Sequence, residues 1–86
     1  MQLSGKRGPR LTDLRRGQQA VISGFDLPEA FSHRLMELGF LPGGLVTAGR
    51  TAPGGDPRVF EVDGSEVALR RETAHHIRIE LRLAGA

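Results

Sequence analysis

Residues 34–44 read RLMELGFLPGG, and this stretch decides the fold of the 86-residue chain. Leu35 and Leu38 complete an apolar helix face, and Gly39 supplies the left-handed conformation that commonly ends a helix. The sequence Pro42-Gly43-Gly44 then predicts a turn, because proline fixes φ and glycine accepts a positive φ. The stretch therefore predicts a helix that ends near residue 38 and passes directly into a strand.

The start of this helix is predicted around Asp26, Pro28 and Glu29. Asp26 suits a helix cap, Pro28 suits the first turn, and Glu29 suits the positive end of a helix dipole. Apolar residues then recur at helical spacing and form one stripe that we expect to be buried: Leu27, Phe31, Leu35 and Leu38. The opposite, solvent-exposed side carries Glu29, His33, Met36 and Glu37.

Five segments have the composition and alternation of strands: Gln18–Phe25, Leu45–Thr51, Arg58–Val62, Ser65–Arg70 and Ile77–Leu83. Asp63-Gly64 predicts a tight hairpin that pairs Val62 with Ser65, Phe60 with Val67 and Arg58 with Leu69. In this register Glu61 lies opposite Glu66, so that face is expected to be exposed or close to an arginine.

The order of these elements predicts a mainly β protein with one α-helix between the first and second strands. Five short strands are expected to curl into a small barrel, because curling removes most of the open edges. Residues 11–86 are expected to form this single domain. It begins with Leu11–Leu14, a short segment that we call the apolar clip because its two leucines are expected to pack on the domain. Residues 1–10 contain Lys6, Arg7 and Arg10 and are expected to form a flexible basic tail.

The composition and motifs of the chain exclude several classes of functional site. The net charge is only +2, and the absence of cysteine excludes disulfides, thiolate metal sites and cysteine nucleophiles. No apolar run is long enough to span a bilayer, and the N-terminus lacks a secretory signal, so a cytoplasmic protein is expected. There is no phosphate-binding loop and no serine nucleophile motif. We therefore expect neither an enzyme nor a cofactor.

Two other kinds of site are weaker candidates. The first is a metal site: Glu29, His33 and Glu37 lie at i, i+4 and i+8 of the helix, where they could chelate a divalent ion, and His75-His76 adds two imidazoles. The preferred interpretation is that these are ordinary solvated residues that bind no metal. Adjacent histidines at a strand end would also point to opposite sides.

A basic nucleic-acid-binding barrel is the other alternative, although such barrels usually rely on aromatic platforms. The chain has four Phe and no Tyr or Trp. Phe31 and Phe60 are expected in the core, which leaves Phe25 and Phe40. The outward arginines, Arg58 among them, alternate with glutamates. This pattern favours a mixed, solvated surface, and no nucleic acid is expected as a partner.

Protein recognition has direct support in the sequence. Met36, Phe40 and Leu41 cluster around the helix end but lie off or beyond the buried stripe, next to Pro42 and Gly43. If they are exposed, they form an apolar patch of the kind that marks partner sites. For Phe40 the preferred interpretation is that it folds back as the hydrophobic contact of the helix cap, whereas Leu41 and Met36 are expected to contact a partner.

These residues resemble the FeoA family of small cytoplasmic accessory proteins in bacterial ferrous-iron uptake. The resemblance covers Leu11 to Leu83 and rests on LMELGF (35–40) with Pro42-Gly43, APGGDP (52–57), VALR (67–70), Ala74 and Ile77. It implies an SH3-like barrel that assists the membrane ferrous-iron transporter FeoB, whose cytoplasmic part is a GTP-binding domain.

The resemblance carries over no metal ligand, and it implies contact with the membrane only through the transporter. The same barrel occurs as the C-terminal domain of DtxR-like metal-dependent repressors. A metal-responsive regulatory domain of that kind is therefore an alternative, although the helix-turn-helix that precedes it in those repressors does not occur in this sequence.

Overall fold

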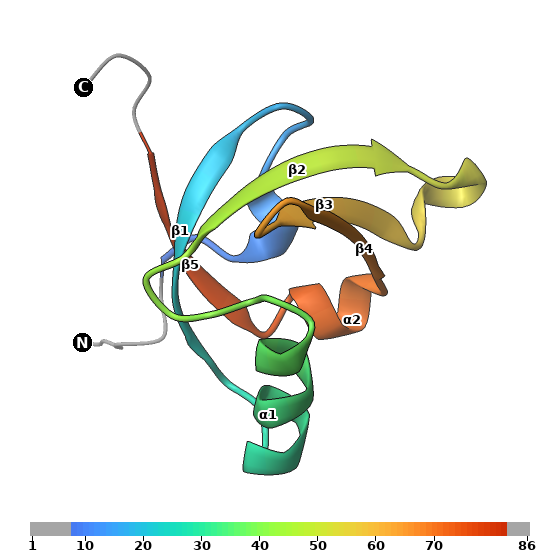
Figure 1. Cartoon of the computed structure of the whole chain (residues 1–86). Coiled ribbons are helices and arrows are strands. Elements are labelled where there is room, and N and C mark those ends of the chain that lie inside the picture. The colour runs from blue at the N-terminus through green and yellow to red at the C-terminus, as the bar shows by residue number, and fades with distance from the viewer. Residues whose placement is uncertain (1–7, 83–86) are drawn as a thin grey trace, which may run out of the picture.

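The computed structural model describes residues 8–82, which form one antiparallel sheet with the helices α1 and α2 at one end (Figure 1). The strand order is β4-β3-β2-β1-β5. The elements in chain order are η1 (Leu11–Asp13), β1 (Gln19–Phe25), α1 (Glu29–Glu37), β2 (Leu45–Thr51), η2 (Pro53–Gly55), β3 (Arg58–Val62), β4 (Ser65–Leu69), α2 (Arg71–Ala74) and β5 (Ile77–Leu81). This order confirms a mainly β fold with one α-helix, α1, between the first and second strands. Within residues 8–82, no helix is long and apolar enough to cross a membrane.

The β3–β4 hairpin has the register that the sequence predicts. Val62 pairs with Ser65, Phe60 with Val67 and Arg58 with Leu69. Asp63 and Gly64 both have positive φ, of 51° and 79°, as the tight turn between two twisted strands requires. Glu61 lies opposite Glu66, both are exposed, and a Glu66 oxygen lies 4.0 Å from the Arg50 guanidinium.

The sheet bends around a single core, and α2 links its two outer strands, β4 and β5 (Figure 1). The buried side chains come from all five strands, from η1, α1 and α2, and from the residues that follow η1 and α1; the largest are Phe40, Phe60, Leu11, Leu14, Ile22 and Ile77. Burial of Leu11 and Leu14 confirms the apolar clip that the sequence predicts at the start of the domain.

The outer edge of β5 takes up part of the expected N-terminal tail. The Ile79 N–H donates to the Pro9 carbonyl at 3.2 Å, and the backbone of Arg10 pairs with that of Arg78 in an isolated antiparallel β-bridge. Arg10 therefore belongs to the folded domain, and its assignment to a flexible tail is wrong. Residues 1–7, the rest of that tail, lie outside the described residues.

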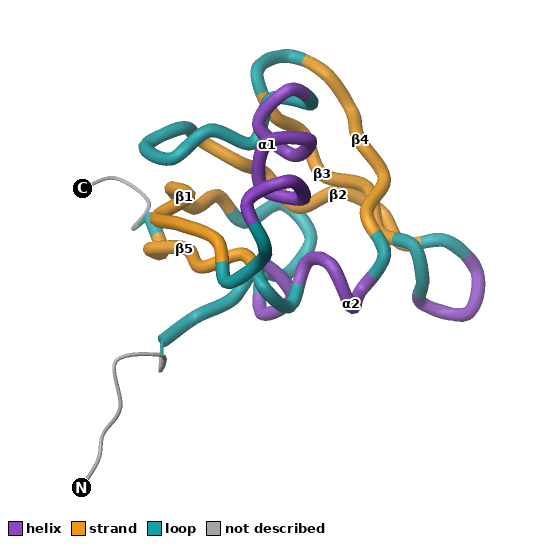
Figure 2. Tube along the Cα trace, turned by 90° about the horizontal axis from the view of Figure 1, so that it is seen from below, coloured by secondary structure: helices purple, strands orange, loops and turns teal. Residues whose placement is uncertain are grey.

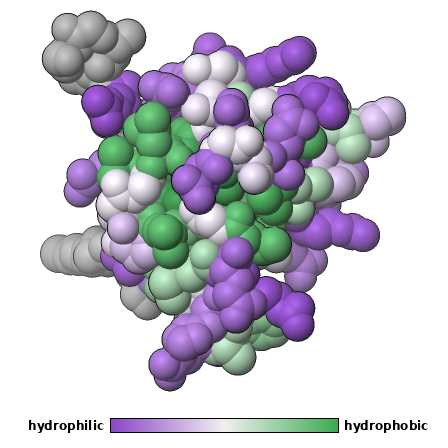
Figure 3. Space-filling model, viewed as in Figure 1, coloured by the Kyte–Doolittle hydropathy of each residue, from purple (hydrophilic) through white to green (hydrophobic). Residues whose placement is uncertain are grey.

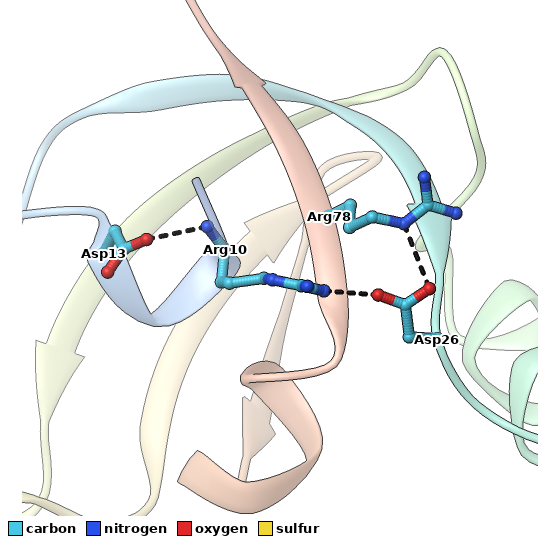
Figure 4. Close-up of polar contacts among 4 residues, drawn as sticks. All are labelled: Arg10, Asp13, Asp26 and Arg78. Carbon is cyan, nitrogen blue, oxygen red and sulfur yellow. Dashed lines mark hydrogen bonds and ion pairs between the residues drawn. The ribbon is translucent and has the colours of Figure 1, made fainter. Parts of the chain in front are cut away.

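Asp26 does not cap α1, contrary to the prediction. The helix begins at Glu29 with Pro28 as its N-cap, and no side chain caps it. The Asp26 carboxylate instead lies between two guanidinium groups, 2.5 Å from Arg10 Nη1 and 3.2 Å from Arg78 Nε (Figure 4). The physical reason is tertiary: the end of β1 brings Asp26 beside β5 and the N-terminal segment, which supply both positive charges.

The apolar stripe of α1 is only partly buried. Leu35 is buried and Leu27 is half-buried, but Phe31 is 59% exposed and Leu38 is 45% exposed. The prediction that Phe31 and Leu38 belong to the core is wrong. Figures 1 and 2 show the reason, since α1 projects from the sheet and only its last turn lies close to the strands.

Candidate docking surface

Two backbone hydrogen bonds, from Gly39 and from Phe40, hold the end of α1 in place. The Gly39 N–H donates to the Met36 carbonyl and the Phe40 N–H donates to the Leu35 carbonyl, each at 3.0 Å. Gly39 has φ of 113°. This is the Schellman arrangement, in which the side chains at the positions of Leu35 and Phe40 usually touch. Both are buried in the core cluster, so Gly39 ends the helix as predicted and Phe40 anchors it.

The chain then turns sharply from Leu41 to Gly44. The Gly44 N–H donates to the Leu41 carbonyl at 2.8 Å, and Gly43 has φ of 86°, as a type II turn with proline second requires. Two further bonds hold this turn against β1. The Gly43 N–H donates to the Ile22 carbonyl at 2.7 Å, and the Ile22 N–H donates to the Gly44 carbonyl at 3.0 Å. The turn is therefore part of the rigid frame of the sheet.

This frame presents apolar groups to solvent. Leu41 is 48% exposed, Pro42 and Gly43 are exposed, and Met36 is half-buried. Leu45, opposite Val21 at the start of β2, is also exposed. We call Met36, Leu41, Pro42, Gly43 and Leu45 the corner surface. In Figure 3, hydrophobic residues gather in the region where Figure 1 places β1, β2 and the loop before β2.

The structure removes one residue, Phe40, from the predicted contact set and adds another, Leu45. Phe40 is fully buried, so it supports the corner surface from below and has no atom available to a partner. Leu45 was missed by the sequence analysis. The signal was present, because Val46 and Ala48 are the inward residues of β2, and the alternation of a strand then turns Leu45 outward.

The candidate metal-binding side chains are not gathered into one site. A Glu29 oxygen lies 3.7 Å from His33 Nε2 on the exposed face of α1. His75 and His76 follow α2 in a helical turn, with ring centroids 5.6 Å apart in an edge-on arrangement. They do not lie on a strand end, so the prediction that they point to opposite sides is wrong. Among residues 8–82, no three His, Asp or Glu side chains are placed to hold a metal ion together.

The aromatic residues are distributed differently from the prediction. Phe40 and Phe60 are buried, Phe25 is half-buried, and Phe31 is exposed. Arg58 is half-buried rather than outward. It donates to the Leu14 carbonyl at 2.5 Å and lies 5.7 Å from the Phe60 ring centroid. One exposed phenylalanine does not make the row of stacking platforms that single-stranded nucleic acid uses.

Known proteins share this fold and sequence. The family model described as FeoA domain matches residues 10–81. A fusion protein of Fe(2+) transport protein A and Fe(2+) transporter FeoB from Porphyromonas gingivalis is 39% identical over 77 residues. That match covers 90% of this chain and only 9% of the fusion protein.

Two solved structures are similar over most of their length. The FeoA protein of Chlorobium tepidum aligns with a TM-score of 0.81 at 32% identity and covers 91% of this chain and 73% of its own. The zinc complex of Stenotrophomonas maltophilia FeoA, described as a prokaryotic SH3 domain protein, aligns with a TM-score of 0.74 at 31% identity. It covers 85% of this chain and 91% of its own. The bent five-stranded sheet is therefore SH3-like.

Proposed function

This chain belongs to the FeoA family of proteins associated with ferrous iron transport, and on that premise we propose that it is a non-enzymatic accessory protein that docks on FeoB in the cytoplasm. The observation that carries this proposal is the relative in which a FeoA-like segment and FeoB form one polypeptide. Two proteins that are fused in one organism commonly act together. We assign the contact on FeoB to its cytoplasmic GTP-binding domain.

The corner surface is the part of this chain that we assign to the contact. Leu41, Pro42 and Gly43 stand on a turn that four backbone groups of β1 and the loop already hold in place. A rigid apolar group loses little conformational entropy when a partner covers it, so more of its burial energy appears as affinity. Met36 extends the surface along α1. We expect Leu41 to be the central anchor, since a few buried apolar groups usually dominate an interface.

Docking would regulate the transporter if the corner surface bound one nucleotide state of the GTP-binding domain more tightly than the other. A ligand shifts an equilibrium only by its difference in affinity for the two states. The affinity of this chain for the domain should therefore be measured with a GTP analogue and with GDP. A difference between the two affinities gives the direction of regulation, and equal affinities indicate a scaffolding role.

The test is a binding titration of the purified chain against the cytoplasmic part of FeoB. Leu41→Asp should weaken binding at least about 10-fold, equivalent to about 1.4 kcal/mol, because a carboxylate would replace the anchor. Leu81→Asp is the matched control, since Leu81 is 52% exposed on β5, outside the corner surface. Both variants should unfold at the same denaturant concentration as the parent chain. The proposal fails if the parent chain does not bind, or if both substitutions weaken binding equally.

A further inference from the structure

A second apolar surface lies between α1 and α2, in a groove of about 420 Å³. Its apolar lining comes from Leu27, from the α1 stripe and from the end of β4: Leu27, Phe31, Leu35, Leu38 and Leu69. Its polar lining consists of Arg34 on the α1 wall and Glu72, Thr73 and His76 on the wall formed by α2 and the residues after it. Figure 2 shows where α1 and α2, which carry several of these residues, lie relative to the strands.

The groove is separate from the corner surface. Successive residues of an α-helix are about 100° apart, so Met36 lies about 140° around α1 from Phe31. Phe31 and Leu38 are the most exposed members of the stripe, with about half of each side chain open to solvent. Large exposed apolar groups of this kind mark contact surfaces.

The walls of the groove carry opposite charges. Arg34 stands on α1 and Glu72 on α2, and neither forms an ion pair with another residue between Gly8 and Arg82. A partner for this groove must therefore offer a negative charge to one wall, a positive charge to the other and an apolar group between them. This chain itself offers all three.

We propose that two copies of this chain associate through the α1–α2 groove as a two-fold symmetric dimer. In a two-fold contact each copy presents the same patch, so a residue on one wall meets the residue on the other wall of its partner. With the axis along the groove, Arg34 of each copy faces Glu72 of the other, and Phe31 of each copy enters the groove of the other. Unlike charges meet on both sides of an apolar centre. The corner surfaces stay exposed, so the dimer does not compete with the docking proposed above.

The association is expected to be weak. Each groove of about 420 Å³ can seat only a few side chains, and exposed charge pairs contribute little, so we expect a contact below the standard interface area of about 1,200–2,000 Å² in total. We expect a dissociation constant of about 10–100 μM.

Sedimentation velocity of the full chain from about 5 to 500 μM, with EDTA present to remove bridging metal ions, tests this arrangement. Arg34→Glu and Glu72→Arg should each raise the dissociation constant at least about 10-fold, because each puts like charges face to face. The double variant Arg34→Glu/Glu72→Arg should return it to within about threefold of the parent value. Only residues that meet across the contact give this rescue.

Phe31→Asp should abolish association while leaving the unfolding transition unchanged, because the side chain is mostly exposed. Leu41→Asp is the control that should leave association intact. The proposal is overturned if the parent chain stays monomeric throughout the range, or if the charge exchange gives no rescue. It is also overturned if Phe31→Asp leaves a monomeric chain unable to bind the cytoplasmic part of FeoB, since the groove would then belong to that partner.

Discussion

Phe40 and Leu41 are adjacent in sequence but face opposite environments, one fully buried and one 48% exposed. Phe40→Ala should lower the free energy of unfolding by about 3–5 kcal/mol, because it leaves a cavity in the core. Leu41→Ala should change it by less than about 0.5 kcal/mol. Urea denaturation of the two variants measures both values. A large loss in Leu41→Ala would mean that the corner surface is part of the core.

Gly39 is constrained in two ways, by its φ of 113° and by its neighbour. A Cβ at this position would lie 3.2 Å from Val62 Cγ2. Gly39→Ala should therefore destabilise the chain by about 1–3 kcal/mol. Gly43→Ala is the control, since Gly43 also has a positive φ but a Cβ there would meet nothing within 4 Å. Equal losses in the two variants would show that backbone strain alone accounts for the effect.

A substitution at Asp26 can show whether its side chain acts as a helix cap or as an ion-pair partner. Asparagine caps helices as well as aspartate does, so Asp26→Asn would be nearly neutral if capping were its role. The contacts with Arg10 and Arg78 instead lead us to expect a loss of about 1–2 kcal/mol. The loss should shrink in 1 M NaCl, where charges are screened. Chemical denaturation at low and high salt, with Asp26→Ala alongside, separates the two roles.

At the scale of elements, the β3–β4 hairpin places Glu61 directly opposite Glu66. Glu61→Lys should stabilise the chain by about 0.2–1 kcal/mol, because it replaces a like-charge pair by an unlike pair on an exposed face. Glu61→Gln, which only removes the repulsion, should give a smaller gain. Thermal unfolding at low ionic strength measures both. A loss of stability in Glu61→Lys would show that Glu61 makes a favourable contact elsewhere.

The elements were predictable from sequence wherever their cause is local. The bounds of β2 and β3, the Asp63-Gly64 turn and the Gly39 helix end all depend on neighbouring residues, and the structure has them as predicted. Phe31 and Leu38 were misjudged because helical spacing shows which residues share a face, not whether the fold covers that face. Asp26 and Arg10 were misjudged because their partners are distant in sequence. At the corner surface the turn was predictable from Pro42 and Gly43, and the burial of Phe40 beneath it agrees with the preferred interpretation of Phe40 as the hydrophobic contact of the helix cap.

At the scale of the whole molecule, the N-terminal segment completes the edge of the sheet. A chain that starts at Leu11 loses the hydrogen bond from Ile79 to Pro9 and the ion pair between Arg10 and Asp26. We expect it to be about 1–3 kcal/mol less stable than the full chain. A chain that starts at Gly8 keeps both contacts and is the control. Equal melting temperatures for the two shortened chains would contradict a structural role for Pro9 and Arg10.

The Ile79 N–H of β5 donates to the Pro9 carbonyl, and the N–H of Arg82, which follows β5, donates to the Gln19 carbonyl of β1. Both ends of the described chain therefore lie beside the β1–β5 side of the sheet. A domain whose ends lie this close together tolerates changes in how its chain is connected. It can be inserted into a host loop, or circularly permuted by joining the ends and opening the Asp63-Gly64 turn, without dismantling the sheet.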